Sequence, residues 1–204
     1  MESAGFDIGS LYFPAFQFHG GEAITILLPN QAHKDQQQIV QCLTGHRMIS
    51  GLSVRARVLL ATPASPPFSW RNWFRSPTPF DWLQKNTRLA NEQIRGILTK
   101  YGLDGNLPLN GYAGTPRALL GLEAAYAEGP DIILFSTDGL DALGRQKVFQ
   151  TVMENLPKCA AIYLAWPYHY QGEERHDVLP GFSSVSVTST TQSRAFQKSV
   201  SPTP

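Results

Sequence analysis

The sequence predicts an α/β fold in which a parallel sheet is layered with helices. Short apolar runs rich in β-forming residues recur along the chain, and segments whose apolar residues repeat at helical spacing stand between them. Strands that alternate with helices in this way are typical of parallel sheets. The 204 residues and the 42% apolar content suit one compact domain with a sizeable core, which we place at residues 1–190.

Four apolar runs predict buried strands, at residues 23–28, 55–61, 131–135 and 161–165. Each run is short and is bounded by glycine, proline or polar residues, as strands usually are. Ahead of them, the aromatic segment 11–18 is predicted to be extended. Pro14 within it fits an edge strand, because proline cannot donate a hydrogen bond to a sheet.

Four further segments predict helices, at residues 35–44, 81–101, 115–129 and about 141–156. In the first, Ile39, Val40 and Leu43 fall on one face, and Gly45 fits the C-terminal cap. The third opens on a Thr-Pro pair, in which Thr115 suits the N-cap and Pro116 the first helical position. Residues 62–80, before the second helix, are too rich in proline for a regular helix or a central strand.

Composition excludes several classes of protein. The net charge of +1 provides no electrostatic footprint for nucleic acid. Cys42 and Cys159 lack the spacing of a zinc site and are interpreted as core thiols. The N-terminus has no basic segment of the signal-peptide kind, and no apolar run approaches the about 20 residues that span a bilayer. We therefore expect a soluble, cytoplasmic protein with no transmembrane segment of its own.

Two stretches carry an ordered set of motifs. The first begins at Gly21-Glu22, passes through the apolar run 23–28 into Pro29-Asn30 and Lys34-Asp35, and closes at Gly45. The second begins at Ala113-Gly114, continues through the helix to Pro130-Asp131 and the strand 131–135, and ends in the sequence Ser-Thr-Asp-Gly-Leu-Asp at 136–141. In this order and spacing, residues 6–182 resemble the ATPase subunit of ABC transporters.

The resemblance implies a P-loop NTPase-like core with a parallel sheet, N-terminal antiparallel strands and a reduced helical subdomain at about residues 62–128. Residues 191–204 would form a flexible tail. Asn30, Lys34 and Asp35 would belong to a degenerate phosphate loop, while Ala113 and Gly114 would be signature-like. Asp138 and Asp141 would lie in the D-loop, a family element that contacts the other half of a dimer.

The chain departs from the family where the chemistry resides. Leu28, Gln31 and His33 stand where the phosphate loop has glycines that let the backbone approach a phosphate. Ser136 and Thr137 replace the carboxylates that bind magnesium and activate water. Trp166 follows the strand that ends in a switch histidine in the family, and we expect it either to pack or to mark an interface. We therefore assign no catalytic and no metal-ligating residue.

Several of these residues have a second interpretation. Lys34 either offers a point charge to an anion or is a solvated loop residue. We expect Asp35 to cap the following helix and so to occupy the vacant anion site itself. Asp138 either takes over an acidic role or belongs to a turn, and Asp141 is either a dimer contact or a helix N-cap.

The expected function is that of a non-catalytic ABC-type subunit, a pseudo-ATPase in a homo- or heterodimer. It would pair with an active ATPase or a membrane permease and reach the inner membrane only through that partner. We expect no cofactor, with weak binding of ATP and magnesium as the alternative. The other candidate functions are a divergent, active ATPase and a freestanding regulatory module.

Aromatic residues in the proline-rich region and just after it would anchor the partner, because exposed aromatics concentrate binding energy. They are Trp70, Trp73, Phe74, Phe80 and Trp82. The alternative is that these side chains form a small satellite core beneath a long loop.

Overall fold

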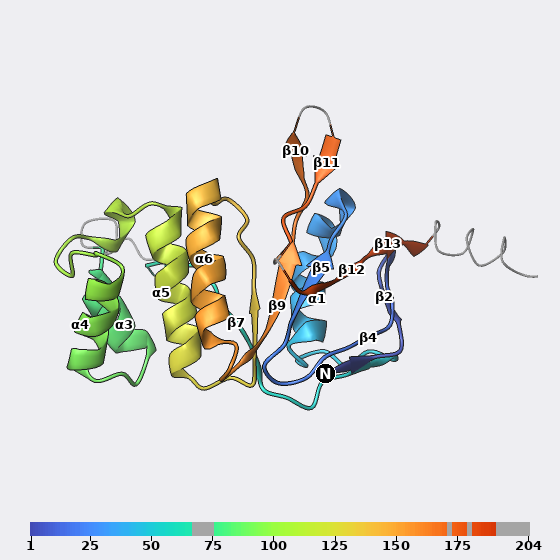
Figure 1. Ribbon diagram of the computed structural model, residues 1–204, viewed down its shortest axis with the longest axis horizontal. Helices are drawn as coiled ribbons and strands as arrows, with labels where there is room; N and C mark the ends of the chain where they lie inside the picture. The colour runs from blue at the N-terminus through green and yellow to red at the C-terminus, as the bar shows by residue number, and fades with distance from the viewer. Residues whose placement is uncertain (67–75, 171–172, 179–180, 191–204) are drawn as a thin grey trace, which may run out of the picture.

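A five-stranded, wholly parallel sheet lies at the centre of the protein (Figure 1). The computed structural model describes residues 1–66, 76–170, 173–178 and 181–190. The strand order across the sheet is β12 (Ser183–Ser186), β5 (Ala23–Leu27), β9 (Ala160–Ala165), β8 (Ile132–Phe135) and β7 (Val58–Leu60). The predicted α/β class and the four predicted strands are confirmed.

The middle of the sheet is covered on both faces, which explains why its strands are apolar along their whole length. Every residue of β8 and β9 is buried. Alternate residues of β9 point to opposite faces, so that Ile162 and Leu164 join one core cluster while Ala161 and Tyr163 join the other.

One face of the sheet packs against α1 (Gln36–Leu43) and the N-terminal strands. These strands form two small antiparallel sheets, as expected. The first contains β4 (Phe16–Gln17), β1 (Glu2–Ser3) and β6 (Leu52–Ser53), and the second contains β13 (Thr188–Ser189), β3 (Leu11–Phe13) and β2 (Phe6–Ile8). Phe6 and Phe13 stack between the strands of the second sheet, with ring centroids 4.7 Å apart.

The other face packs against α5 (Gly114–Ala127) and α6 (Ala142–Asn155) (Figure 1). Beyond α5 lie α3 (Pro79–Asn86), α4 (Asn91–Lys100) and the short 3-10 helix η2 (Leu109–Gly111), whose core is small. That core contains Ala64, Leu83, Ile94, Leu98, Leu109 and Leu120.

The two predicted core thiols are confirmed, and they lie in different layers. Cys42 is buried on the α1 side of the sheet and Cys159 on the α5–α6 side, and both are free. Burial raises the pKa of both thiols, that of Cys159 to about 11.

Three details differ from the sequence-based expectation. The single helix predicted at 81–101 is wrong, because the chain becomes extended at Thr87 and a new helix starts after Ala90, whose N–H donates to the Gln93 side chain at 2.9 Å. α5 starts at Gly114, so Ala113 and not Thr115 is its N-cap residue. The hairpin of β10 (Tyr168–Tyr170) and β11 (Glu173–Arg175), and the edge strand β12, were not predicted.

None of the helices within the described ranges is long and apolar enough to cross a membrane.

Two helical glycines provide a matched test of this packing. A Cβ at Gly121 in α5 would overlap the Thr62 carbonyl oxygen, whereas a Cβ at Gly96 in α4 would meet nothing. We expect Gly121→Ala to lower the free energy of unfolding by about 1–3 kcal/mol, because the loop must move away from the helix. Gly96→Ala is expected to raise it by about 1 kcal/mol through helix propensity. Denaturant unfolding measures both, and equal effects would contradict the close approach of α5 to residue 62.

Candidate functional site

The candidate site lies at the edge of the sheet where the parallel strands end. Ligands of open α/β sheets bind at this edge. The turn after β5 carries Asn30, Lys34 and Asp35, and the turn after β8 carries Asp138 and Asp141. Because β5, β9 and β8 are neighbours in parallel register, the segments that follow them leave the sheet at the same edge.

The segment after β5 is a 3-10 helix, η1 (Asn30–Asp35), that runs directly into α1. Ala32 N–H donates to the Pro29 carbonyl at 2.8 Å, and Gln36 N–H donates to the His33 carbonyl. In a 3-10 helix each N–H points back to the carbonyl three residues earlier. A phosphate cradle instead needs consecutive N–H groups that converge on the anion. The hydrogen-bonding pattern of η1 therefore differs from that of a phosphate cradle.

His33 fixes this turn against the neighbouring strand. Its ring stacks on Trp166, which directly follows β9, with centroids 4.2 Å apart and planes 15° apart. Trp166 is 7% exposed, so the histidine covers it from the solvent side. Packing was one of the two expectations for Trp166, but its partner was missed. The register of the two strands indicates this partner, because Leu27 pairs with Ala165 and the residues that follow both strands lie near each other.

The prediction that Asp35 caps α1 is wrong. Its side chain makes no capping hydrogen bond, and its backbone, at φ −104° and ψ 6°, lacks the extended conformation that is usual for a capping residue. The carboxylate lies instead against the turn between β2 and β3, where a Cβ on Gly9 would be 3.1 Å from Asp35 Oδ1. Asn30 and Lys34 are exposed, and Lys34 forms no ion pair with any residue in the described ranges.

The residues after β8 serve the packing of the sheet edge. Thr137 is buried, and its hydroxyl shares a 2.7 Å hydrogen bond with the Tyr163 hydroxyl. Burial raises the pKa of Tyr163 to about 12, so this phenol is neutral at physiological pH. Ser136 Oγ accepts a hydrogen bond from Asp138 N–H at 3.1 Å, while the Asp138 side chain is exposed.

The two segments that were predicted to be signature-like and to form the D-loop lie against each other. Asp141 caps α6, its Oδ1 accepting from Gly144 N–H at 2.6 Å, which agrees with the helix-cap interpretation. At the start of α5, a Cβ on Gly114 would be 3.1 Å from Leu140 Cδ2, so only a small residue fits there without adjustment. Ala113 precedes it, exposed, as the N-cap.

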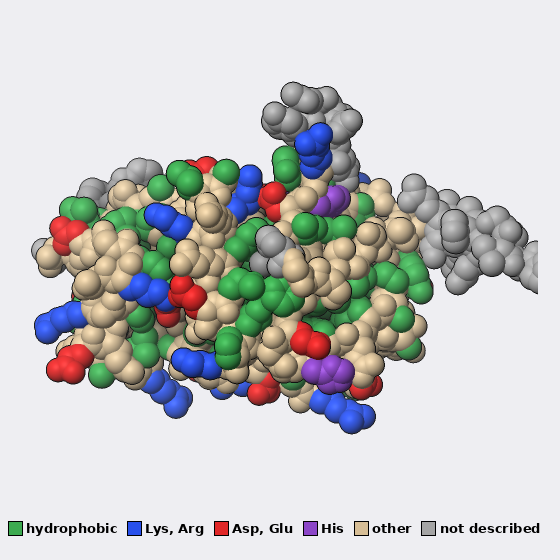
Figure 2. Space-filling view, in the orientation of Figure 1, with side chains coloured by type: hydrophobic (Ala, Val, Ile, Leu, Met, Phe, Trp, Pro, Cys, Tyr) green, Lys and Arg blue, Asp and Glu red, His purple; other side chains and the backbone are tan. Residues whose placement is uncertain are grey.

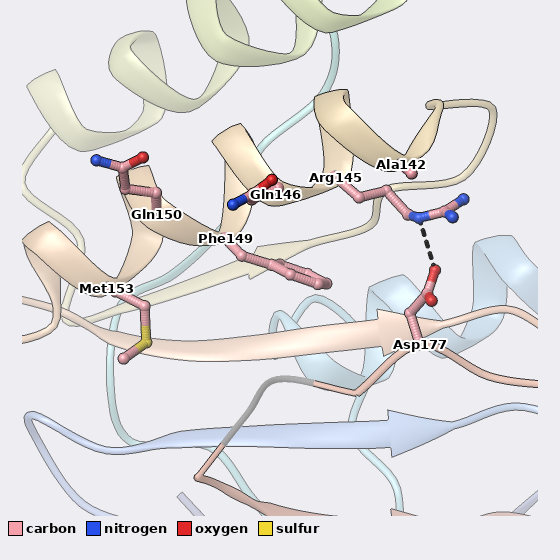
Figure 3. Close-up of a pocket in the computed structure, with 7 residues that line it drawn as sticks. All are labelled: Ala142, Arg145, Gln146, Phe149, Gln150, Met153 and Asp177. Atoms are coloured by element: carbon pink, nitrogen blue, oxygen red, sulfur yellow. Dashed lines mark ion pairs between the residues drawn. The ribbon is translucent and has the colours of Figure 1, made fainter.

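A hollow of about 500 Å³ lies beside α6 and was not predicted (Figure 3). Phe149 and Met153 line it from α6, and Arg145 reaches from the same helix to Asp177, with 2.8 Å between Nε and Oδ2. Figure 2 shows hydrophobic side chains gathered between α6 and β9 at this place. No local sequence signature could reveal a contact between residues that lie so far apart in the chain.

The predicted partner-binding aromatics are only partly described. Phe80 and Trp82 are half-buried and pack against the small core of α3, α4 and η2. Trp82 Nε1 also donates to the Ser65 carbonyl at 3.0 Å. For these two side chains the geometry is that of the satellite core. Trp70, Trp73 and Phe74 lie outside the described residues.

Comparison with known proteins identifies the fold. No protein-family profile matches the sequence, and no curated protein matches it in sequence. Among solved structures, the chain is similar to a metal-chelate type ABC transporter in an inward-facing conformation, with a TM-score of 0.57 and 14% identity over 82% of this chain and 76% of that chain. It is also similar to a model of ribosome-bound archaeal Pelota and ABCE1, with a TM-score of 0.57 and 16% identity over 98% of this chain and 36% of that chain. The predicted ABC ATPase-like fold is confirmed.

Asp141 and Asp138 form a matched pair for testing the turn after β8. We expect Asp141→Ala to cost about 1 kcal/mol, because the capping bond to Gly144 N–H is lost. Asp138→Ala is expected to change stability by less than about 0.5 kcal/mol, since its side chain is exposed. Thermal unfolding measures both, and a drop of about 2–4 °C should appear for Asp141→Ala alone.

Proposed function

We propose that this chain is a non-catalytic subunit of the ABC ATPase type, which pairs with an active ATPase subunit or a membrane permease. The fold supports the ABC ATPase type, since one similar structure is that of an ABC transporter. The site at the strand ends supports the absence of catalysis. In this proposal the subunit works in the cytoplasm and is held at the inner membrane through its partner.

The observation that carries the proposal is the closed turn after β5. The N–H groups of Ala32 and Gln36 are bonded to carbonyls of this turn, and His33 stacks on Trp166. Binding a triphosphate there would require the turn to unwind and the stack to separate. Lys34 is left as a solvated charge beside Asp35, whose carboxylate would repel a phosphate by about 4 kcal/mol at about 4 Å and an effective dielectric constant of about 20.

The residues at the other strand ends do not fit magnesium-ATP chemistry either. The hydroxyl of Thr137, which stands in the place of a family carboxylate, is bonded to Tyr163 inside the core. The competing idea of a divergent ATPase needs Lys34, Asp35 and Asp138 to act together, and Asp35 lies against Gly9 instead.

Calorimetric titration tests the proposal directly. With ATP, in the presence and absence of magnesium, we expect no heat beyond dilution, which corresponds to a dissociation constant weaker than about 1 mM. The Lys34→Ala variant is expected to behave like the parent protein, because Lys34 contacts no described acid. A saturable heat that Lys34→Ala abolishes, or steady phosphate release by the purified protein, would refute the non-catalytic assignment.

The predicted partner-binding tryptophans can be tested against one that packs in the helical core. We expect the double variant Trp70→Ala, Trp73→Ala to lose copurification of an ATPase or permease. Trp82→Ala should instead melt earlier, because this ring packs against the helical core and bonds Ser65. Mass spectrometry identifies the captured protein by an intact phosphate loop or by several membrane spans. Unaltered capture by the double variant would show that these tryptophans do not anchor the partner.

A further inference from the structure

The chain between β9 and β12 crosses the end of the sheet, and its described residues form no helix. It runs through the β10–β11 hairpin, which projects from the body of the protein, and returns as residues 173–178 (Figure 1). Two adjacent residues of this return segment, His176 and Asp177, make contacts in different directions. Both side chains are partly buried.

His176 holds the root of the turn after β5. Its Nε2 lies 2.7 Å from the carbonyl oxygen of Leu28, the residue that connects β5 to Pro29 and η1. A carbonyl can only accept, so this ring nitrogen donates. Leu28 N–H in turn donates to the Ala165 carbonyl at 3.0 Å. The residue at which a phosphate loop would begin is therefore held on both of its backbone groups.

Asp177 holds the return segment to α6. Its Oδ2 is 2.8 Å from Arg145 Nε, and these side chains are 25% and 28% exposed. Arg145 is itself fixed, because it donates to the Leu140 carbonyl at 3.0 Å and its guanidinium lies 5.6 Å from the centre of the Tyr168 ring. Figure 3 shows Arg145 extending from α6 to Asp177.

We propose that residues 173–178 are a latch that keeps the turn at 29–35 in its closed form. His176 holds the turn, and the Arg145–Asp177 ion pair holds the latch to α6. The inference rests on the proposed function only in assigning this turn to the phosphate-loop position. The Arg145–Asp177 ion pair is partly exposed and lines the hollow beside α6. A charged group of a partner that competes for Arg145 or Asp177 would therefore release His176. The turn would then be free to open.

Two other hollows in the described part of the chain lie beside Lys100 and Tyr101, among side chains of α4, α5 and α6. Glu123 bonds both Tyr101 and Lys100 there, so these side chains hold the helices together and point to no ligand.

Native-state hydrogen exchange, measured without nucleotide, tests the latch. The reporters are the N–H groups of Ala32 and Gln36, which are bonded within the closed turn. We expect Asp177→Ala and His176→Ala each to speed their exchange about tenfold, the equivalent of about 1.4 kcal/mol in local opening. Exchange in β8 should stay as in the parent protein. His176→Gln keeps a donor and should restore much of the protection.

A matched control removes an ion pair elsewhere. Glu128→Ala breaks the Arg57–Glu128 pair, whose atoms are 3.3 Å apart, and should leave the turn unchanged. If the latch acts as one unit, the double variant His176→Ala, Asp177→Ala will exchange no faster than the faster single variant.

Parental exchange at residues 29–36 in Asp177→Ala would overturn the latch. So would the same acceleration in β8, which would indicate a general loss of stability, or strictly additive effects in the double variant. None of these outcomes bears on nucleotide binding, which the titration with ATP judges separately.

Discussion

The register between β5 and β9 sets Leu27 opposite Ala165, so the two strands end together and the residues after them emerge side by side. One of those residues leads into η1 and the other is Trp166, and the stack with His33 follows from that placement. A slip of one residue would exchange the two faces of β9. Tyr163 would then leave Thr137, and Ile162 would leave the core on the α1 side. The geometry of the whole edge therefore depends on this pairing.

A second constraint is the close contact of α5 with α6 and with the loop at residue 62. Gly114, Gly121 and Gly144 each sit where a side chain would press on a neighbouring atom. In sequence these glycines look like weak points in helices, since glycine lowers helix stability. In space, Gly114 and Gly144 allow the start of α5 to meet the turn that Asp141 closes, and Gly121 lets α5 approach residue 62.

The strands and the fold class could be predicted because burial on two faces leaves a plain mark, an uninterrupted apolar run. Ile24, Ile133 and Ile162 each stand in such a run. The closed turn could not be predicted in the same way. Gln31, His33 and Asp35 predicted a departure from a glycine-rich phosphate loop, but not that the backbone becomes a 3-10 helix or that Asp35 turns toward Gly9. Those outcomes depend on Trp166 and on the N-terminal strands, which are remote in sequence. The contacts of His176 and Asp177 could not be predicted either, because the polar residues around them are typical of any solvated loop.

The two thiols described above lie on opposite sides of one continuous sheet, and each is shielded from water. Only the thiolate reacts with alkylating reagents, and burial disfavours that form. Neither Cys42 nor Cys159 should therefore react with such reagents while the chain is folded. Cys42 would report when the layer beneath the N-terminal strands separates, and Cys159 when the helical layer does. The two thiols would therefore report separately on the opening of the two layers that cover the sheet.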